Sequence, residues 1–137
     1  MLMSSPDVAV WIASQTIDMR KGCFSLAVLV QQEFELDPKS SQLFVFFGRG
    51  GTKVKLLQWD RNGFVLTYKC LADGRFRPPK LGGKKYKVSL SDLNLLLEGI
   101  DLTHRRLRVM SPLETLEIDF YNLKWRLEVV KFEMSVE

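Results

Sequence analysis

The chain has 137 residues, of which 46% are hydrophobic, 26% charged and 11% aromatic, and its formal net charge at pH 7 is +4. This length and apolar content suit one folded domain and exclude an intrinsically disordered chain. No apolar run reaches the roughly 18 residues of a membrane span, and the first residues lack a signal-peptide pattern. The two cysteines, Cys23 and Cys70, show no CxxC spacing. We therefore expect a cytoplasmic protein without disulfides.

The first predicted elements are a short strand and a helix. Residues 8–13 form an apolar segment that predicts the strand. Apolar residues then recur every three or four positions, which predicts a helix over residues 18–34 with Asp18 as its N-cap. Asp37 and Pro38 are expected to stop this helix, because the residue before a proline avoids the helical region.

The middle of the sequence has the pattern of a β-meander. Residues 43–47 are unbroken apolar, as expected for a strand buried on both faces. Residues 53–59 and 64–70 predict the next two strands, joined by an Asn62-Gly63 turn in which both residues tolerate positive φ. An irregular basic loop follows, and residues 86–88 predict a short last strand.

Two capping boxes mark helices in the last third. Ser89 and Asp92 open a predicted helix that ends at Gly99. A second box, residues 111–114, precedes a heptad over residues 113–134 that predicts a C-terminal helix able to self-associate. A strand-like alternation over residues 121–129 competes with this pattern, and the caps favour the helix. The heptad positions are Leu113, Leu116, Phe120, Leu123, Leu127, Val130 and Met134.

The positive charge is concentrated in one segment. Residues 49–87 carry 11 basic and 2 acidic side chains, whereas both flanking segments are net acidic. Lysine and arginine neutralise phosphates and neighbouring aromatic side chains can stack on bases, so the segment predicts nucleic-acid contact. Lysines on the wet face of a sheet are also ordinary solubilising residues, and this second interpretation stays open. The candidate DNA-binding residues are Arg49, Lys53, Lys55, Lys69, Arg75, Arg77, Lys80, Lys84, Lys85 and Lys87.

Patterns for catalysis are weak by comparison. Asp18, Asp60 and Asp101 each lie near an element boundary, and three carboxylates could hold Mg²⁺ for a nuclease reaction if they met in space. Structural roles as a cap, a turn residue and a helix-exit residue are the stronger explanation. The only histidine is His104, and neither cysteine lies in an activating or zinc-binding motif. We therefore expect no catalytic residue, metal or cofactor.

A series of short motifs runs through the first three-quarters of the chain. The motif residues are Asp18, Met19, Arg20, Lys21, Gly22, Trp59, Asp60, Gly63, Tyr68, Lys69, Gly74, Arg75, Phe76, Glu98 and Gly99. This series resembles a known family, the TnpB accessory proteins of the insertion sequence 66 group of bacterial transposable elements, also called Orf2-like. The resemblance covers about residues 8–106 and leaves residues 111–137 outside it.

This resemblance implies an accessory role in DNA transposition. A separate DDE-type transposase would carry the strand-cleaving chemistry, so the partners implied are DNA and that transposase. A module that only mediates protein interaction, through the heptad at 113–134, is the alternative. We predict an α+β fold: a mostly antiparallel sheet flanked by two helices. Residues 1–106 would form the accessory domain and residues 107–137 a helical extension.

Overall fold

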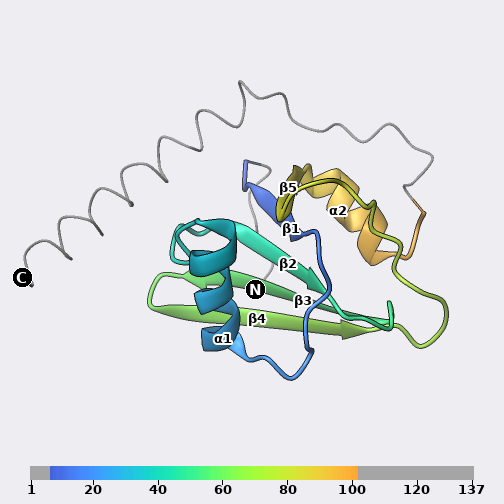
Figure 1. The fold of residues 1–137 in the computed structure, drawn as a ribbon, viewed down its shortest axis with the longest axis horizontal. Helices are drawn as coiled ribbons and strands as arrows, with labels where there is room; N and C mark the ends of the chain where they lie inside the picture. The colour runs from blue at the N-terminus through green and yellow to red at the C-terminus, as the bar shows by residue number, and fades with distance from the viewer. Residues whose placement is uncertain (1–6, 102–137) are drawn as a thin grey trace, which may run out of the picture.

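A five-stranded sheet with one helix region on each face makes up the part of the chain described by the computed structural model, residues 7–101 (Figure 1). The predicted heptad, the second capping box and the competing strand pattern all lie outside these residues. The elements in chain order are β1 (Val10–Ala13), α1 (Cys23–Leu29), the π-helical turn η1 (Val30–Phe34), β2 (Leu43–Phe47), β3 (Lys53–Asp60), β4 (Gly63–Cys70), β5 (Lys85–Val88) and α2 (Leu90–Leu97).

The sheet combines a meander with a parallel pair. Its strand order is β4-β3-β2-β1-β5. Strands β2, β3 and β4 follow one another as antiparallel neighbours, which confirms the predicted meander. Strand β1 lies between β2 and β5, parallel to the first and antiparallel to the second. The predicted α+β class with a mostly antiparallel sheet is therefore confirmed.

Each face of the sheet packs against its own helix. Phe44 and Phe46 of β2 lie on the face covered by α1 and η1, together with Leu26 of α1. Val45 and Phe47 lie on the opposite face, in a cluster that includes Leu93 and Leu96 of α2. All five residues of β2 are buried, as the unbroken apolar run predicts. Full burial of one such side chain stabilises the fold by roughly 1.5–3 kcal/mol.

The first helix begins later than predicted. α1 starts at Cys23 with Gly22 at its N-cap position and no side-chain cap, so the prediction of Asp18 as the N-cap is wrong. The Asp18 carboxylate instead accepts a hydrogen bond from the Arg20 backbone N–H. Ile17 forms an isolated parallel bridge with Gly48, which holds this segment extended along the end of β2. The helix ends at Phe34, because Glu35 adopts a left-handed conformation (φ 55°) before Pro38 is reached.

The β3–β4 hairpin is confirmed, but its turn is shifted by one residue. Asp60 pairs with Gly63, so Arg61 and Asn62 form the two-residue loop and Gly63 already belongs to β4. The positive φ falls on Arg61 (φ 51°), so the expected Asn62-Gly63 turn is wrong. Eight consecutive pairs between β3 and β4 fix this register, and the turn follows from it.

Both ends of α2 follow the sequence prediction. The Ser89 side chain accepts a hydrogen bond from the Asp92 N–H at 3.1 Å, as a capping residue does. Gly99 has φ 83°, and the N–H groups of Gly99 and Ile100 donate to the carbonyls of Leu96 and Leu95. This pairing closes the helix as a Schellman motif. None of the helices within residues 7–101 has the length and apolarity to cross a bilayer.

Candidate nucleic-acid interface

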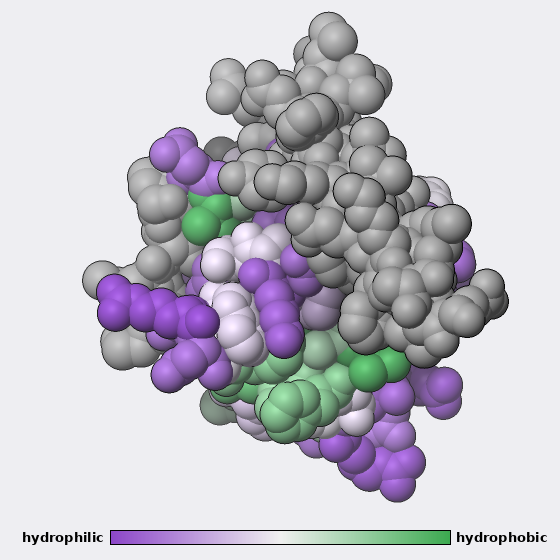
Figure 2. Space-filling view, turned by 90° about the vertical axis from the view of Figure 1, so that its left-hand side faces the viewer, coloured by the Kyte–Doolittle hydropathy of each residue, from purple (hydrophilic) through white to green (hydrophobic). Residues whose placement is uncertain are grey.

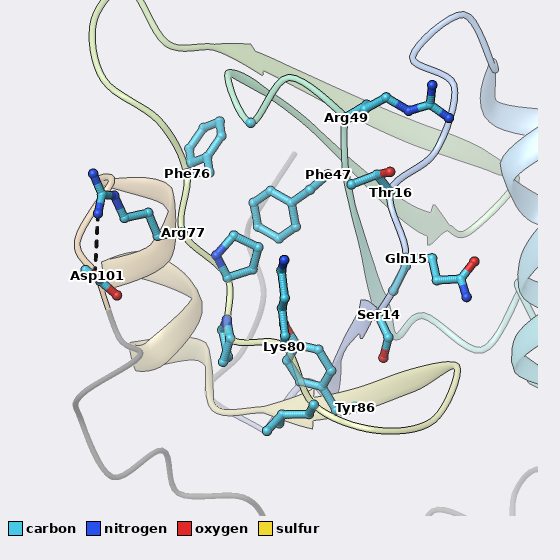
Figure 3. Close-up of a pocket in the computed structure, with 16 residues that line it drawn as sticks. Ser14, Gln15, Thr16, Phe47, Arg49, Phe76, Arg77, Lys80, Tyr86 and Asp101 are labelled. Carbon is cyan, nitrogen blue, oxygen red and sulfur yellow. Dashed lines mark ion pairs between the residues drawn. The ribbon is translucent and has the colours of Figure 1, made fainter.

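Three loops meet at one end of the sheet and enclose a cavity (Figure 3). Because β1 and β2 are parallel, the loops that follow them leave the sheet at the same end. The irregular loop between β4 and β5 joins them there, since the Phe76 N–H donates to the Gly51 carbonyl at 2.6 Å. The cavity has a volume of about 900 Å³. Its lining includes Ser14, Gln15, Thr16, Phe47, Arg49, Phe76, Arg77, Pro78, Pro79, Lys80, Tyr86 and Asp101.

The cations of this cavity point in different directions. The Lys80 ammonium group points into the cavity toward the Phe47 ring (Figure 3). Arg77 turns to the side and pairs with Asp101, with 3.6 Å between the guanidinium nitrogen and the carboxylate oxygen. Arg49 extends away from Phe47. The cavity therefore combines one inward cation with aromatic walls.

A second hollow of about 460 Å³ adjoins the first, and the two share Thr16, Gly48 and Arg49. Its wall is completed by Ile17, Asp18 and Met19 from the loop before α1 and by Gly50, Thr52 and Lys53 after β2. Arg75 also lies at this end, because its side chain is close to Gly51. The name basic end is used below for the five cations gathered here: Arg49, Lys53, Arg75, Arg77 and Lys80.

Lys55 holds one wall of the basic end in place. Its side chain is only 9% exposed, and its ammonium group donates to the carbonyls of Met19 (2.6 Å) and Lys21 (2.8 Å). The ammonium also lies 5.4 Å from the centre of the Tyr68 ring, a cation–π distance. Its hydrogen-bonding groups face the protein, so the structure gives Lys55 a role in anchoring the loop before α1.

The same loop presents an exposed ion pair. The Arg20 guanidinium donates to both Asp18 carboxylate oxygens, with 2.7 Å between Nη2 and Oδ2. These hydrogen bonds hold the pKa of Asp18 well below its ordinary value and raise the pKa of Arg20. The Met19 side chain lies against Gly48, where an added Cβ would be 2.8 Å from the Met19 Cγ.

The other predicted DNA-binding residues lie away from the basic end or are engaged by the protein. Lys69 donates to the Leu97 carbonyl at 2.7 Å, and so links β4 to the end of α2. Lys84 pairs with Glu33 at 3.5 Å. Lys85 lies 5.5 Å from the centre of the Trp11 ring, and Lys87 is buried. The ten candidates thus divide into five at the basic end and five with contacts elsewhere.

Most of the remaining family-motif residues support the fold, through ring contacts, turns or a helix end. Trp59 packs edge to face with Phe64, with 4.9 Å between ring centres. Phe76 is buried and lies 5.6 Å from Phe47. Asp60 and Gly63 close the hairpin, Gly74 and Gly99 have positive φ, and Glu98 is the C-cap residue of α2.

The three aspartates of the nuclease alternative do not form a site. Within residues 7–101, no group of three histidine, cysteine, aspartate or glutamate side chains is arranged to hold a metal ion. Asp18 and Asp101 each face an arginine, and Asp60 lies at the hairpin turn.

Sequence reasoning missed the residues that shape the cavity: Ser14, Gln15 and Thr16 after β1, and Phe47 at the end of β2. The sequence signal that could have located them was the predicted order of elements over residues 8–47: a strand, a helix and a second strand. A crossover helix between neighbouring strands makes them parallel and brings the loops after both strands to one edge. Ligand sites in such sheets commonly lie outside these carboxyl ends.

These features define a small α+β protein with a basic, hollowed sheet end. The model of the IS66 Orf2-like protein family matches residues 8–107, and the chain belongs to this family of insertion-sequence accessory proteins. It is 43% identical to the uncharacterized protein y4hO of Sinorhizobium fredii over 104 residues, covering 76% of this chain and 90% of that protein. It is 29% identical to the uncharacterized protein y4jC of the same organism over 103 residues, covering 75% and 88%. No solved structure gives a significant match.

Proposed function

We propose that this protein is a non-catalytic accessory factor in transposition that contacts DNA through the basic end. This proposal is supported by four cations that line two adjoining hollows, with Arg75 beside Gly51 at the same end, in a family defined by an insertion sequence. Exposed lysines and arginines in one place neutralise neighbouring phosphates and release counterions. Strand cleavage belongs, on this proposal, to a separate transposase of the same element.

The salt dependence of DNA binding tests this proposal. Fluorescence anisotropy at several salt concentrations gives the slope of log affinity against log salt. Replacing Arg49 by glutamine at the basic end should reduce this slope by about 1. Arg61→Gln is the matched control, because Arg61 is exposed at the β3–β4 turn, at the opposite end of the sheet. Absence of salt-dependent binding, or equal effects of the two variants, would contradict the proposal.

A second function, docking of the transposase, is favoured by an exposed apolar surface. Phe24 of α1 is 75% exposed although it packs edge to face on Phe64, and Val28 follows one helical turn later at 48%. Figure 2 shows hydrophobic side chains gathered in the lower part of the molecule, at the height of α1 and β4 in Figure 1. Exposed apolar patches of this kind mark interaction sites.

Co-purification with the transposase of the same element tests this second function. Phe24→Ser should reduce recovery of the transposase and leave DNA affinity unchanged. Ile100→Ser is the control, because Ile100 is an exposed apolar residue that follows α2 and lines neither hollow. Equal recovery with both variants would refute docking at α1. The heptad at 113–134 remains the alternative contact, and Leu123→Asp in the full chain should then change its oligomeric state.

A further inference from the structure

The larger cavity of the basic end has walls suited to a flat aromatic group. Phe47 and Phe76 line it from β2 and the β4–β5 loop, and Tyr86 lines it from β5 (Figure 3). Pro78 and Pro79 complete the apolar wall. All three aromatic side chains are under 8% exposed, so they offer ring edges and a rigid wall. A rigid wall needs little ordering when a ligand binds, which favours affinity.

The charge of this cavity favours an anion next to the aromatic group. Arg49, Arg77 and Lys80 line it against a single carboxylate, Asp101, which already pairs with Arg77. Within residues 7–101, no carboxylate forms an ion pair with Arg49 or Lys80. The Lys80 ammonium points toward Phe47, so its charge lies beside the apolar wall.

The adjoining hollow adds one more cation. Arg49 lines both hollows, and Lys53 lies in the second one together with Asp18, whose carboxylate pairs with Arg20. A ligand with a flat aromatic group and a repeated negative charge can contact both the apolar wall and the cations. The volume of about 900 Å³ falls in the range of small-molecule sites, so one nucleotide can be accommodated.

We propose that the larger cavity receives one unpaired base of a single-stranded nucleic acid, with Lys80 and Arg49 contacting the phosphates on either side. This proposal rests on the proposed DNA contact and adds to it a preference for single strands. A base-paired duplex keeps its bases stacked inside the helix, and extruding one costs a few kcal/mol. A peptide with aromatic and acidic residues shares part of this chemistry, but a nucleic acid carries one aromatic base and one negative phosphate in every unit of its chain.

Comparison of strands with and without bases tests the proposal on the full chain. Anisotropy titrations use a labelled 12-nucleotide deoxythymidine strand, an abasic strand of the same length and charge, and a duplex. The intact strand should bind about 5- to 10-fold tighter than the abasic strand, near the lower limit for stacking of one base because the rings are mostly buried. Lys80→Met should weaken binding of the intact strand, and Lys39→Met, at the opposite end of the sheet beside Trp59, should not.

The location of the base is tested by photo-crosslinking of a strand that carries 5-iododeoxyuridine, followed by peptide mapping. Crosslinks to Phe47, Phe76 or Tyr86 are expected. Crosslinks confined to α1 or β4 would overturn the proposal, as would equal affinity for intact and abasic strands. If both strands still bind with a salt-dependent affinity, the proposed DNA contact survives. Tighter binding of free thymidine monophosphate, or of a peptide of alternating phenylalanine and glutamate, than of the strand would also overturn it.

Discussion

Replacing Lys55 by methionine removes a buried ammonium group and keeps most of its apolar stem. The group donates two hydrogen bonds, at 2.6 and 2.8 Å, to loop carbonyls. A hydrogen bond from a charged donor contributes about 1.5–3 kcal/mol. Two effects reduce the loss in the variant: water can hydrogen-bond to the part-buried carbonyls, and the cost of desolvating the ammonium group disappears. We therefore expect the free energy of unfolding to fall by about 2–3 kcal/mol and the Tm by about 10 °C.

Lys53→Met is the matched control for this prediction. Lys53 lies two positions earlier on the same strand face and is exposed, so its loss should change stability by less than about 0.5 kcal/mol. The DNA effects should be reversed: Lys53→Met reduces the salt slope by about 1, and Lys55→Met leaves it unchanged below its Tm. Urea unfolding and anisotropy give both quantities. Near-zero destabilisation by Lys55→Met would refute the anchoring role.

Three further predictions follow from single contacts. Gly48→Ala should lower the free energy of unfolding by about 1–3 kcal/mol, because the new Cβ would lie 2.8 Å from Met19 Cγ. Adding Met19→Ala should recover part of this loss in a double-mutant cycle. If the effects of the two substitutions simply add, the clash is disproved. Ser89→Ala should lower the free energy of unfolding by about 1 kcal/mol, and the exposed Ser91→Ala should not; equal values would argue against the cap. The pKa of the Asp18 carboxyl, measured by NMR titration, should lie well below its ordinary value of about 3.9. Its folded-state pKa is lowered, so its stabilising effect is present above about pH 4 and is lost as the pH falls through that lower pKa; a midpoint near 4 would contradict the ion pair.

The sequence predicts the elements whose signals are local. The unbroken apolar run of β2, the N-cap at Ser89 and the glycine after α2 each satisfy a requirement set by neighbouring residues, and all are confirmed. The alternation in β3 and β4 likewise predicts two strands at nearly their observed bounds.

The roles of the lysines could not be predicted in this way. Lys53 and Lys55 occupy equivalent positions in the alternation of β3, yet one is exposed and the other buried. The difference comes from the loop before α1, in which the carbonyls of Met19 and Lys21 accept hydrogen bonds from the Lys55 ammonium group. Asp18 failed as a cap for a similar reason, since Arg20 and the bridge to Gly48 hold its segment outside the helix.

The place of β1 in the sheet bears on how the chain folds during its synthesis. Among the strands of residues 7–101, β1 is made first and one of its neighbours, β5, is made last: Val10 pairs with Val88. All four residues of β1 are buried in the finished fold. Until residues 85–88 leave the ribosome, one edge of this apolar strand has no partner, and such edges attract other chains. The nascent protein should therefore be most prone to aggregation, and most dependent on chaperones, between the completion of the β2–β4 meander and the arrival of β5.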